Sequence, residues 1–290
     1  MTNTTKSFRN KWFRNKKLAF AETLRENSDI FLWILRRNGF KSAGAFKRYL
    51  SEKKRILDAG CGNGRVTALM RKYTDPRDTQ IIGIDKVSAR VARENLLSCK
   101  NVSIFSKDLL KDLSSLGKLD FIYCQEVLHH TGNPLKAFKN LCSCLERGGE
   151  IAIYVYRKKS PTREYADDYI RSKVSCLGYK KAMKECEQIT RLGKQLSESN
   201  VKIKIPNVDV LQIIKGEYTL QRFVYHFFMK CFWNPKLSFK ENVAINYDWY
   251  HPQDASRHTV EEVRSWFKKA GLRTVHEHVD FYGITIRGRK

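Results

Sequence analysis

Short runs of mainly apolar residues alternate with longer amphipathic segments between residues 51 and 157. The runs are apolar almost throughout, which is typical of strands that are buried on both faces. The segments between them have the apolar spacing of helices. Strands that alternate with helices predict an α/β fold with a parallel sheet and crossover helices. The five expected strands are Arg55–Leu57, Gln80–Asp85, Asn101–Phe105, Leu119–Cys124 and Glu150–Tyr156.

The pattern changes on either side of this core. Residues 1–50 place aromatic side chains such as Phe8 and Trp12 at helical spacing and predict an N-terminal extension of two or three helices. Residues 158–245 break the alternation and predict a basic, mainly helical insertion, and residues 246–290 are expected to return to the core.

Inside the insertion, helices are expected at Arg163–Val174 and Lys180–Gln195, with Cys186 and Leu192 on the inner face of the second. The aromatic run Leu220–Trp233 favours a buried helix over a row of base-stacking platforms.

The last segment carries clear helix boundaries. Thr259 and Glu262 have the spacing of a capping box, and Gly271 is a typical C-terminal cap. They predict a helix over Val260–Ala270. Two strands at the edge of the sheet are expected to follow it as a hairpin, Leu272–Val279 and Phe281–Arg287.

A glycine-rich turn joins the first strand to the first helix of the core. Residues 54–65 read KRILDAGCGNGR, so Gly60, Gly62 and Gly64 follow the buried strand directly. Strand, glycine turn and helix form the nucleotide-binding geometry of doubly wound α/β proteins. Arg65 occupies the place of the third glycine in a dinucleotide site. The turn therefore indicates a nucleotide-like ligand, but the motif lacks the glycine spacing that binds the pyrophosphate of a dinucleotide.

Polar side chains follow the ends of the expected strands. Because ligands of open parallel sheets bind beyond the carboxyl ends of the strands, these side chains are expected to line one crevice. Asp85 lies 25 residues after Gly60, near the spacing at which an acidic residue binds a ribose. The strand-end residues are Asp58, Asp85, Asp108, Glu126 and Tyr156.

The chain of 290 residues has 55 Lys and Arg against 30 Asp and Glu, a formal net charge of +25. This charge indicates an anionic partner such as nucleic acid, an acidic lipid surface or a phosphorylated substrate, and the alternative is a solvated basic surface. The eight Cys form no C-x-x-C pair or His/Cys cluster, which argues against zinc and disulfides and favours the reducing cytoplasm. No metal is expected, nor a signal peptide or a membrane-spanning segment, and peripheral contact with a membrane stays open.

The ordered motifs ILDAGCGNG, IIGID, KDLL, DFIYCQEVLHH and LERGGEIAIYVY together resemble class I S-adenosylmethionine (SAM)-dependent methyltransferases of the ubiquinone/menaquinone-biosynthesis-like type 11 kind. The resemblance implies a Rossmann-like seven-stranded sheet and SAM as cofactor. The usual Pro-Gly-Gly turn before the fifth strand is Arg147-Gly148-Gly149 here. By this resemblance the residues expected at the cofactor are Asp58, Gly60, Cys61, Gly62, Asn63, Gly64, Asp85, Lys86, Asp108, Leu109 and Gln125.

The sequence motifs identify the catalytic and acceptor-binding residues less specifically than the cofactor-binding residues. His129, His130 and Glu126 follow the fourth strand, where a general base would stand, although a sulfonium methyl donor can react through proximity alone. The two histidines have an alternative interpretation as loop residues. The expected acceptor contacts are Tyr156, Tyr250, Arg257 and His258, and a structural role in capping a corner of the fold is the alternative for the last three.

The expected reaction is methyl transfer to a small-molecule, sugar or lipid-linked acceptor, which is either neutral or anionic, with oxygen as the expected nucleophile. The fourth strand ends in Cys124-Gln125-Glu126, which is unlike the Asp/Asn-Pro-Pro-aromatic motif of amino-methylating nucleic-acid enzymes. An RNA methyltransferase is the alternative, supported by charge, and a non-catalytic SAM-binding protein is the third. The insertion is expected to close over the crevice as a lid and to recognise the acceptor.

Overall fold

The computed structural model describes residues 2–290, which divide into two compact units. The larger unit holds Trp12–Arg157 and Ser256–Lys290, and the smaller unit holds Lys158–Ala255 with the described residues up to Lys11. These boundaries differ from the expected ones. The first residues of the N-terminal extension group with the insertion, and the insertion runs on to Ala255 because its last helix packs within the smaller unit.

The larger unit is built on a seven-stranded sheet with the order β3-β2-β1-β4-β5-β9-β8. The first five strands in this order are parallel, whereas β9 is antiparallel to β5 and β8 is antiparallel to β9. This arrangement confirms the α/β prediction and the C-terminal hairpin. The strands are β1 (Arg55–Ala59), β2 (Gln80–Ile84), β3 (Val102–Phe105), β4 (Leu119–Gln125), β5 (Leu145–Tyr156), β8 (Arg273–Val279) and β9 (Gly283–Arg289).

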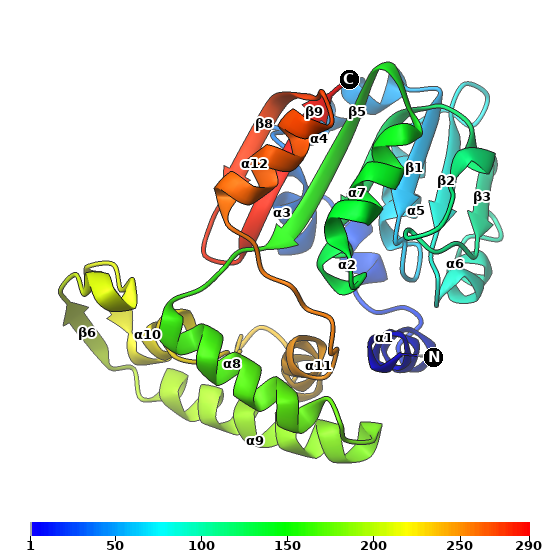
Figure 1. Ribbon diagram of the computed structural model, residues 1–290. Helices are drawn as coiled ribbons and strands as arrows, with labels where there is room; N and C mark the ends of the chain where they lie inside the picture. Colours follow the sequence, from blue (N-terminus) through cyan, green and yellow to red (C-terminus); the bar gives the residue numbers. More distant parts are fainter. Residues whose placement is uncertain (1) are drawn as a thin grey trace. The chain divides into compact units, whose positions relative to one another are not determined.

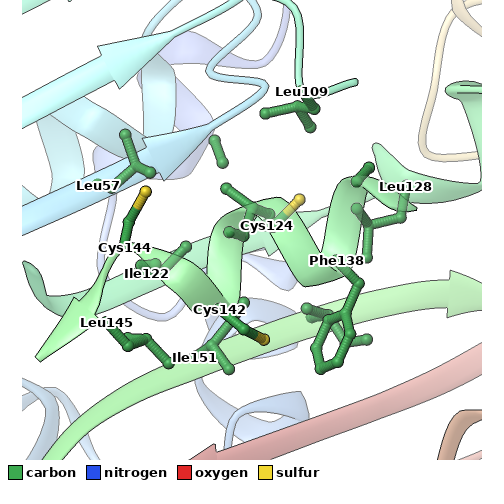
Figure 2. Close-up of a cluster of buried hydrophobic side chains, with 14 of the residues drawn as sticks. Leu57, Leu109, Ile122, Cys124, Leu128, Phe138, Cys142, Cys144, Leu145 and Ile151 are labelled. Atoms are coloured by element: carbon green, nitrogen blue, oxygen red, sulfur yellow. The ribbon is translucent and has the colours of Figure 1, made fainter. Parts of the chain in front are cut away.

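Helices cover both faces of this sheet (Figure 1). On one face α7 (Pro134–Ser143) and α12 (Val260–Lys269) bury a large apolar cluster, part of which Figure 2 shows around Phe138 and Leu128. On the other face α3 (Asp29–Arg37), α4 (Ala43–Ser51) and α5 (Arg65–Lys72) bury a second cluster. Burial on both faces explains why the strands read as continuous apolar runs. Two further helices of this unit are α2 (Phe20–Leu24) and α6 (Ala89–Asn95).

The start of α12 corrects one detail of the predicted helix. The Thr259 side chain caps it by accepting a hydrogen bond from the backbone N–H of Glu262 at 3.1 Å. The Glu262 carboxylate does not complete the capping box, because it lies 2.8 Å from Nδ1 of His258 instead.

The smaller unit is mainly helical, as expected, with a two-stranded ribbon of β6 (Lys202–Ile205) and β7 (Gly216–Thr219). Cys186 is buried, as predicted. The Leu192 side chain is 40% exposed, so the prediction that it faces inward is wrong. The helices of the smaller unit are α8 (Pro161–Val174), α9 (Tyr179–Glu198), α10 (Leu220–Phe227) and α11 (Phe239–Tyr250), together with the first residues of α1 (Asn3–Arg14).

The aromatic run at 220–233 is helical only as far as Phe227, so the expected helix is too long. Side chains of α11 satisfy the irregular backbone that follows: Asn246 accepts from the N–H of Phe232 at 2.9 Å, and Asn242 accepts from that of Asn234 at 2.7 Å. These amide contacts remove the need for helical hydrogen bonds.

A buried ion pair organises the interior of the smaller unit. Arg163 and Asp167, one helical turn apart on α8, have exposed side-chain fractions of 2% and 1% and lie 3.1 Å apart. The Asp167 carboxylate also accepts hydrogen bonds from the Trp249 indole at 2.9 Å and the Tyr250 hydroxyl at 2.7 Å. Burial opposes ionisation of Asp167, but the adjacent guanidinium prevails and lowers its pKa.

Asp167→Asn should lower the free energy of unfolding by about 3–5 kcal/mol, because it leaves the Arg163 charge buried and unpaired. Chemical denaturation followed by tryptophan fluorescence measures the change. Asp168→Asn is the matched control, since the neighbouring Asp168 side chain is 57% exposed and its loss should cost under about 1 kcal/mol. Equal effects of the two substitutions would show that the buried pair does not hold this unit together.

Candidate active site

The glycine turn after β1 is closely packed against its neighbours. Gly60, Gly62 and Gly64 have φ angles of 81°, 58° and 84°, a region that favours glycine. A Cβ atom on Gly60 would lie 2.3 Å from Val127, and one on Gly62 would lie 2.8 Å from the Trp12 ring. The backbone N–H groups of residues 60 and 61 both donate to the Ile84 carbonyl, at 2.7 and 3.0 Å. The turn is therefore held against β2 with its backbone at the carboxyl edge of the sheet.

Carboxylates stand at the ends of three neighbouring strands. Asp58 lies near the end of β1, Asp85 directly follows β2, and Asp108 lies in the loop after β3. Because adjacent strands are about 4.8 Å apart, the three groups are spread along the edge in the order of the strands. An elongated ligand with separate polar parts matches this arrangement.

Asp85 joins the glycine turn to the following loop. One carboxylate oxygen accepts from the backbone N–H of Gly62 at 3.1 Å. The other accepts from the N–H groups of Val87 and Ser88 at 2.7 and 2.8 Å. These contacts fix the carboxylate, and its four lone-pair positions leave it capacity for one further donor.

Asp58 is 3% exposed and accepts a hydrogen bond from the Thr67 hydroxyl at 2.6 Å. Burial is the largest influence and raises the pKa of Asp58 to about 6, while the Thr67 hydrogen bond and the Arg65 charge act in the opposite direction. A ligand with a positive charge would favour the ionised form of this carboxyl.

Asp108 pairs with Lys86, whose amino group lies 2.7 Å from its carboxylate. Burial acts to raise the pKa of Asp108, but the bond from Lys86 and one from the Leu110 backbone outweigh it, so the pKa is lowered. Leu109 and Cys61 are both buried, at 6% and 5% exposure.

Asn63 has a role that the motif did not reveal. It is fully buried, and its side-chain amide donates to the carbonyls of Lys16 and Leu18 at 3.1 and 3.0 Å. Asn95 donates to the same Lys16 carbonyl at 2.9 Å. The glycine turn thus anchors the N-terminal segment.

The three candidate catalytic residues differ in exposure. Glu126 has a left-handed backbone with φ of 61°, a 46% exposed side chain, and a carboxylate 3.9 Å from Arg65. His129 is 1% exposed and stacks on Tyr156 with ring centroids 3.7 Å apart, whereas His130 is partly buried. Glu126 is therefore the most accessible of the three.

Three of the four candidate acceptor residues belong to the larger unit. The imidazole ring of His258 lies between the Ser256 hydroxyl, 2.9 Å from Nε2, and the Glu262 carboxylate, 2.8 Å from Nδ1. The backbone N–H of His258 donates to the Tyr156 carbonyl at 2.9 Å. His258 therefore holds the segment that begins at Ser256 against the end of β5. The neighbouring Arg257 is partly buried.

Tyr250 belongs to the smaller unit and is completely buried. Its hydroxyl donates to Asp167 and lies 2.9 Å from the Lys230 carbonyl. These contacts give Tyr250 a structural role in the buried network.

No group of three or more His, Cys, Asp or Glu that could hold a metal ion occurs among residues 2–290. Over the same residues, no helix is long and apolar enough to cross a membrane.

Comparison with known proteins identifies the family. A family model described as "Methyltransferase domain" matches residues 28–188, more than half of the chain. The chain therefore belongs to this family, which confirms the resemblance to class I SAM-dependent methyltransferases. A solved structure of PKMT2 from Rickettsia typhi shares the fold, with a TM-score of 0.56 at 14% identity over 84% of this chain and 52% of that one.

Curated relatives match only in part. The tRNA U34 carboxymethyltransferase of Campylobacter fetus is 31% identical over 118 residues, which cover 39% of this chain and 41% of that protein. The ubiquinone biosynthesis O-methyltransferase of Coxiella burnetii is 27% identical over 105 residues, which cover 34% and 42%. The chain thus spans less than half the length of these relatives.

Asp58→Asn should remove a pH dependence of stability. Between the unfolded pKa of 3.8 and the folded pKa of about 6, the folded chain binds more protons than the unfolded chain, so stability falls as the pH rises. This loss amounts to roughly 2 kcal/mol from pH 4.5 to 7.5, and it is absent from the amide. Urea denaturation of the wild type, Asp58→Asn and the exposed control Asp78→Asn at both pH values tests this. A wild-type slope shared by Asp58→Asn would contradict the assignment.

Proposed function

We propose that this protein transfers the methyl group of SAM to an oxygen atom of a small-molecule, sugar or lipid-linked acceptor. The observation that carries the proposal is the row of carboxylates Asp58, Asp85 and Asp108 beside the glycine turn. SAM consists of a methionine part, a ribose and an adenine in sequence, and three polar groups in strand order β1, β2 and β3 complement these parts.

The residues present fit SAM in their chemistry. The Asp58 carboxylate would hold the methionine amino group, whose positive charge would lower the cost of ionising this buried acid. Asp85 would accept a hydrogen bond from the ribose hydroxyls. Asp108 would accept one from the adenine amino group in exchange for its bond with Lys86. When bound, SAM supplies a methyl group on a positively charged sulfur, which is electrophilic without help from a metal.

The acceptor would then stand beside the ends of β4 and β5. Glu126 is the residue we assign to orient the acceptor hydroxyl and to take its proton, because it is exposed and its backbone is held in a costly conformation. His129 would pack against Tyr156 and shape this end of the sheet, and His130 is the alternative proton acceptor. Oxygen as the methylated atom agrees with the name of the Coxiella relative.

The smaller unit is proposed to recognise the acceptor. The chain passes between the units at three points, and within the larger unit all three lie at the carboxyl edge of the sheet. Trp12 touches the glycine turn, Arg157 follows the end of β5, and the N–H of Ser256 donates to the His129 carbonyl at 2.9 Å. The chain thus leaves and re-enters the larger unit at the edge where the methyl group would be transferred.

RNA is the second candidate acceptor, because the net charge is +25 and the Campylobacter relative is a tRNA U34 carboxymethyltransferase. An RNA substrate would bind with a steep salt dependence, since phosphate contacts release counterions. The fourth strand does not end in the motif of amino-methylating nucleic-acid enzymes, and this favours the small-molecule acceptor. Tight binding of structured RNA near physiological salt, with that salt dependence, would reverse this choice.

Asp85→Ala should weaken SAM binding by about 1.5–3 kcal/mol, the scale of a hydrogen bond to a charged group. Asp85→Asn keeps one acceptor oxygen of the same size and should fall between the alanine variant and the wild type. Isothermal titration calorimetry with SAM on protein shown to be folded by circular dichroism measures both. Unchanged SAM affinity in the alanine variant would sink the proposed ribose site.

Glu126 substitutions should separate stability from activity. Glu126→Gly relieves the left-handed conformation and should raise the free energy of unfolding by about 1 kcal/mol. Glu126→Gln keeps the side-chain size and should lower the rate of methyl transfer from radiolabelled SAM about 100-fold or more, with little change in SAM affinity. Full activity of the glutamine variant on an accepted substrate would exclude Glu126 as the base.

A further inference from the structure

A row of side chains crosses β4, β5 and β9 on the face of the sheet that α3 covers. Gln125, the last residue of β4, is the register partner of Tyr154 on β5, and Tyr154 is the register partner of Thr285 on β9. Register partners point to the same face of a sheet, so Gln125 and Thr285 flank Tyr154. This row lies next to the carboxyl end of β4, where the acceptor of an open α/β sheet is expected.

Arg37, the last residue of α3, lies against this row. It is 2% exposed, and its guanidinium carbon lies 4.7 Å from the centre of the Tyr154 ring and 4.5 Å from that of Trp33. One terminal nitrogen, Nη2, donates to Asp280 at 2.5 Å. The other, Nη1, is buried and has no hydrogen-bond partner within residues 2–290.

Two further polar atoms in the row are also buried without a hydrogen-bond partner among the described residues. The Gln125 amide is oriented by its donation to Asn38 at 2.8 Å, and Asn38 in turn donates to the Ile34 carbonyl at 2.8 Å. This leaves Oε1 of Gln125 buried without a partner in the described part of the chain. Thr285 is completely buried, and its hydroxyl likewise lacks a partner there.

A buried polar atom without a hydrogen bond destabilises a fold, and proteins rarely keep one without a reason. Here a donor, an acceptor and a hydroxyl that can act as either surround a single tyrosine. The charge of Arg37 is already balanced by Asp280, so a second anion would be poorly compensated at this buried position. An uncharged ligand that both donates and accepts hydrogen bonds matches the chemistry of these three atoms.

We propose that Arg37, Gln125 and Thr285 bind an uncharged hydroxyl-bearing ring of the methyl acceptor. Nη1 of Arg37 donates to one ring oxygen, a ring hydroxyl donates to Oε1 of Gln125, and the Thr285 hydroxyl completes the set. This inference rests on the proposed function and specifies its acceptor. A phenolic ring and a sugar ring share this chemistry.

The test uses the full chain saturated with S-adenosylhomocysteine, the product of SAM after methyl transfer. Catechol and methyl β-glucopyranoside are titrated separately by ligand-observed NMR, with inorganic phosphate as a competitor. We expect one of the two rings to bind, which identifies the source, and phosphate to leave the bound signal unchanged. Binding of neither ring, or displacement of the bound ring by phosphate, would overturn the proposal.

Thr285→Val, Arg37→Lys and the exposed control Thr274→Val define the site. Thr285→Val removes an unsatisfied hydroxyl at equal volume, so it should not lower the unfolding temperature, and it should weaken ring binding at least 10-fold. Arg37→Lys keeps the charge facing Asp280 but lacks the second terminal nitrogen, and it should show a similar loss. Thr274→Val should bind like the wild type. Equal ring binding by all four proteins would refute the assignment.

Titration with S-adenosylhomocysteine alone distinguishes a failure of the acceptor site from a failure of the proposed function. If it binds to the wild type and both rings fail, the acceptor site is wrong and the cofactor site stands. If it does not bind, the proposed function itself fails.

Discussion

The attachment of the glycine turn to β2 is the constraint on which the candidate site depends. Two backbone N–H groups of the turn donate to the Ile84 carbonyl, and the N–H of Gly62 donates to the Asp85 carboxylate. Side chains on Gly60 or Gly62 would collide with Val127 or Trp12. The same turn therefore fixes the backbone beside the ligand, the acid of the next strand, and the N-terminal segment that packs on it.

Several features of the sheet edge cost stability, and the ligand binding that we propose would explain them. Asp58 is an acid buried far enough to raise its pKa to about 6, and Glu126 occupies a left-handed conformation. Arg37, Gln125 and Thr285 bury polar atoms without partners among the described residues. Strain and unsatisfied polar groups tend to collect at functional sites, because a ligand restores the missing interactions. The buried pair of the smaller unit differs, since Asp167 has a donor for each oxygen.

The sequence predicted the parallel core well, because strands buried on both faces are apolar throughout and the segments between them have the apolar spacing of helices. It also predicted that acids at three strand ends would share one edge. It could not predict the role of Asn63, whose partners are backbone carbonyls 45 or more residues away. Nor could it find Arg37 or Thr285, since their meeting with Gln125 depends on the order of β4, β5 and β9 in space. The helix at 220–233 was predicted too long because amide side chains from α11 satisfy the backbone after Phe227.

A crystal structure of the protein with S-adenosylhomocysteine would show directly where the cofactor binds. We expect the adenine beside Asp108, the ribose hydroxyls within hydrogen-bond distance of Asp85, and the amino group of the methionine part beside Asp58. The reversed orientation, or the ligand bound away from the carboxyl ends of β1, β2 and β3, would contradict this expectation.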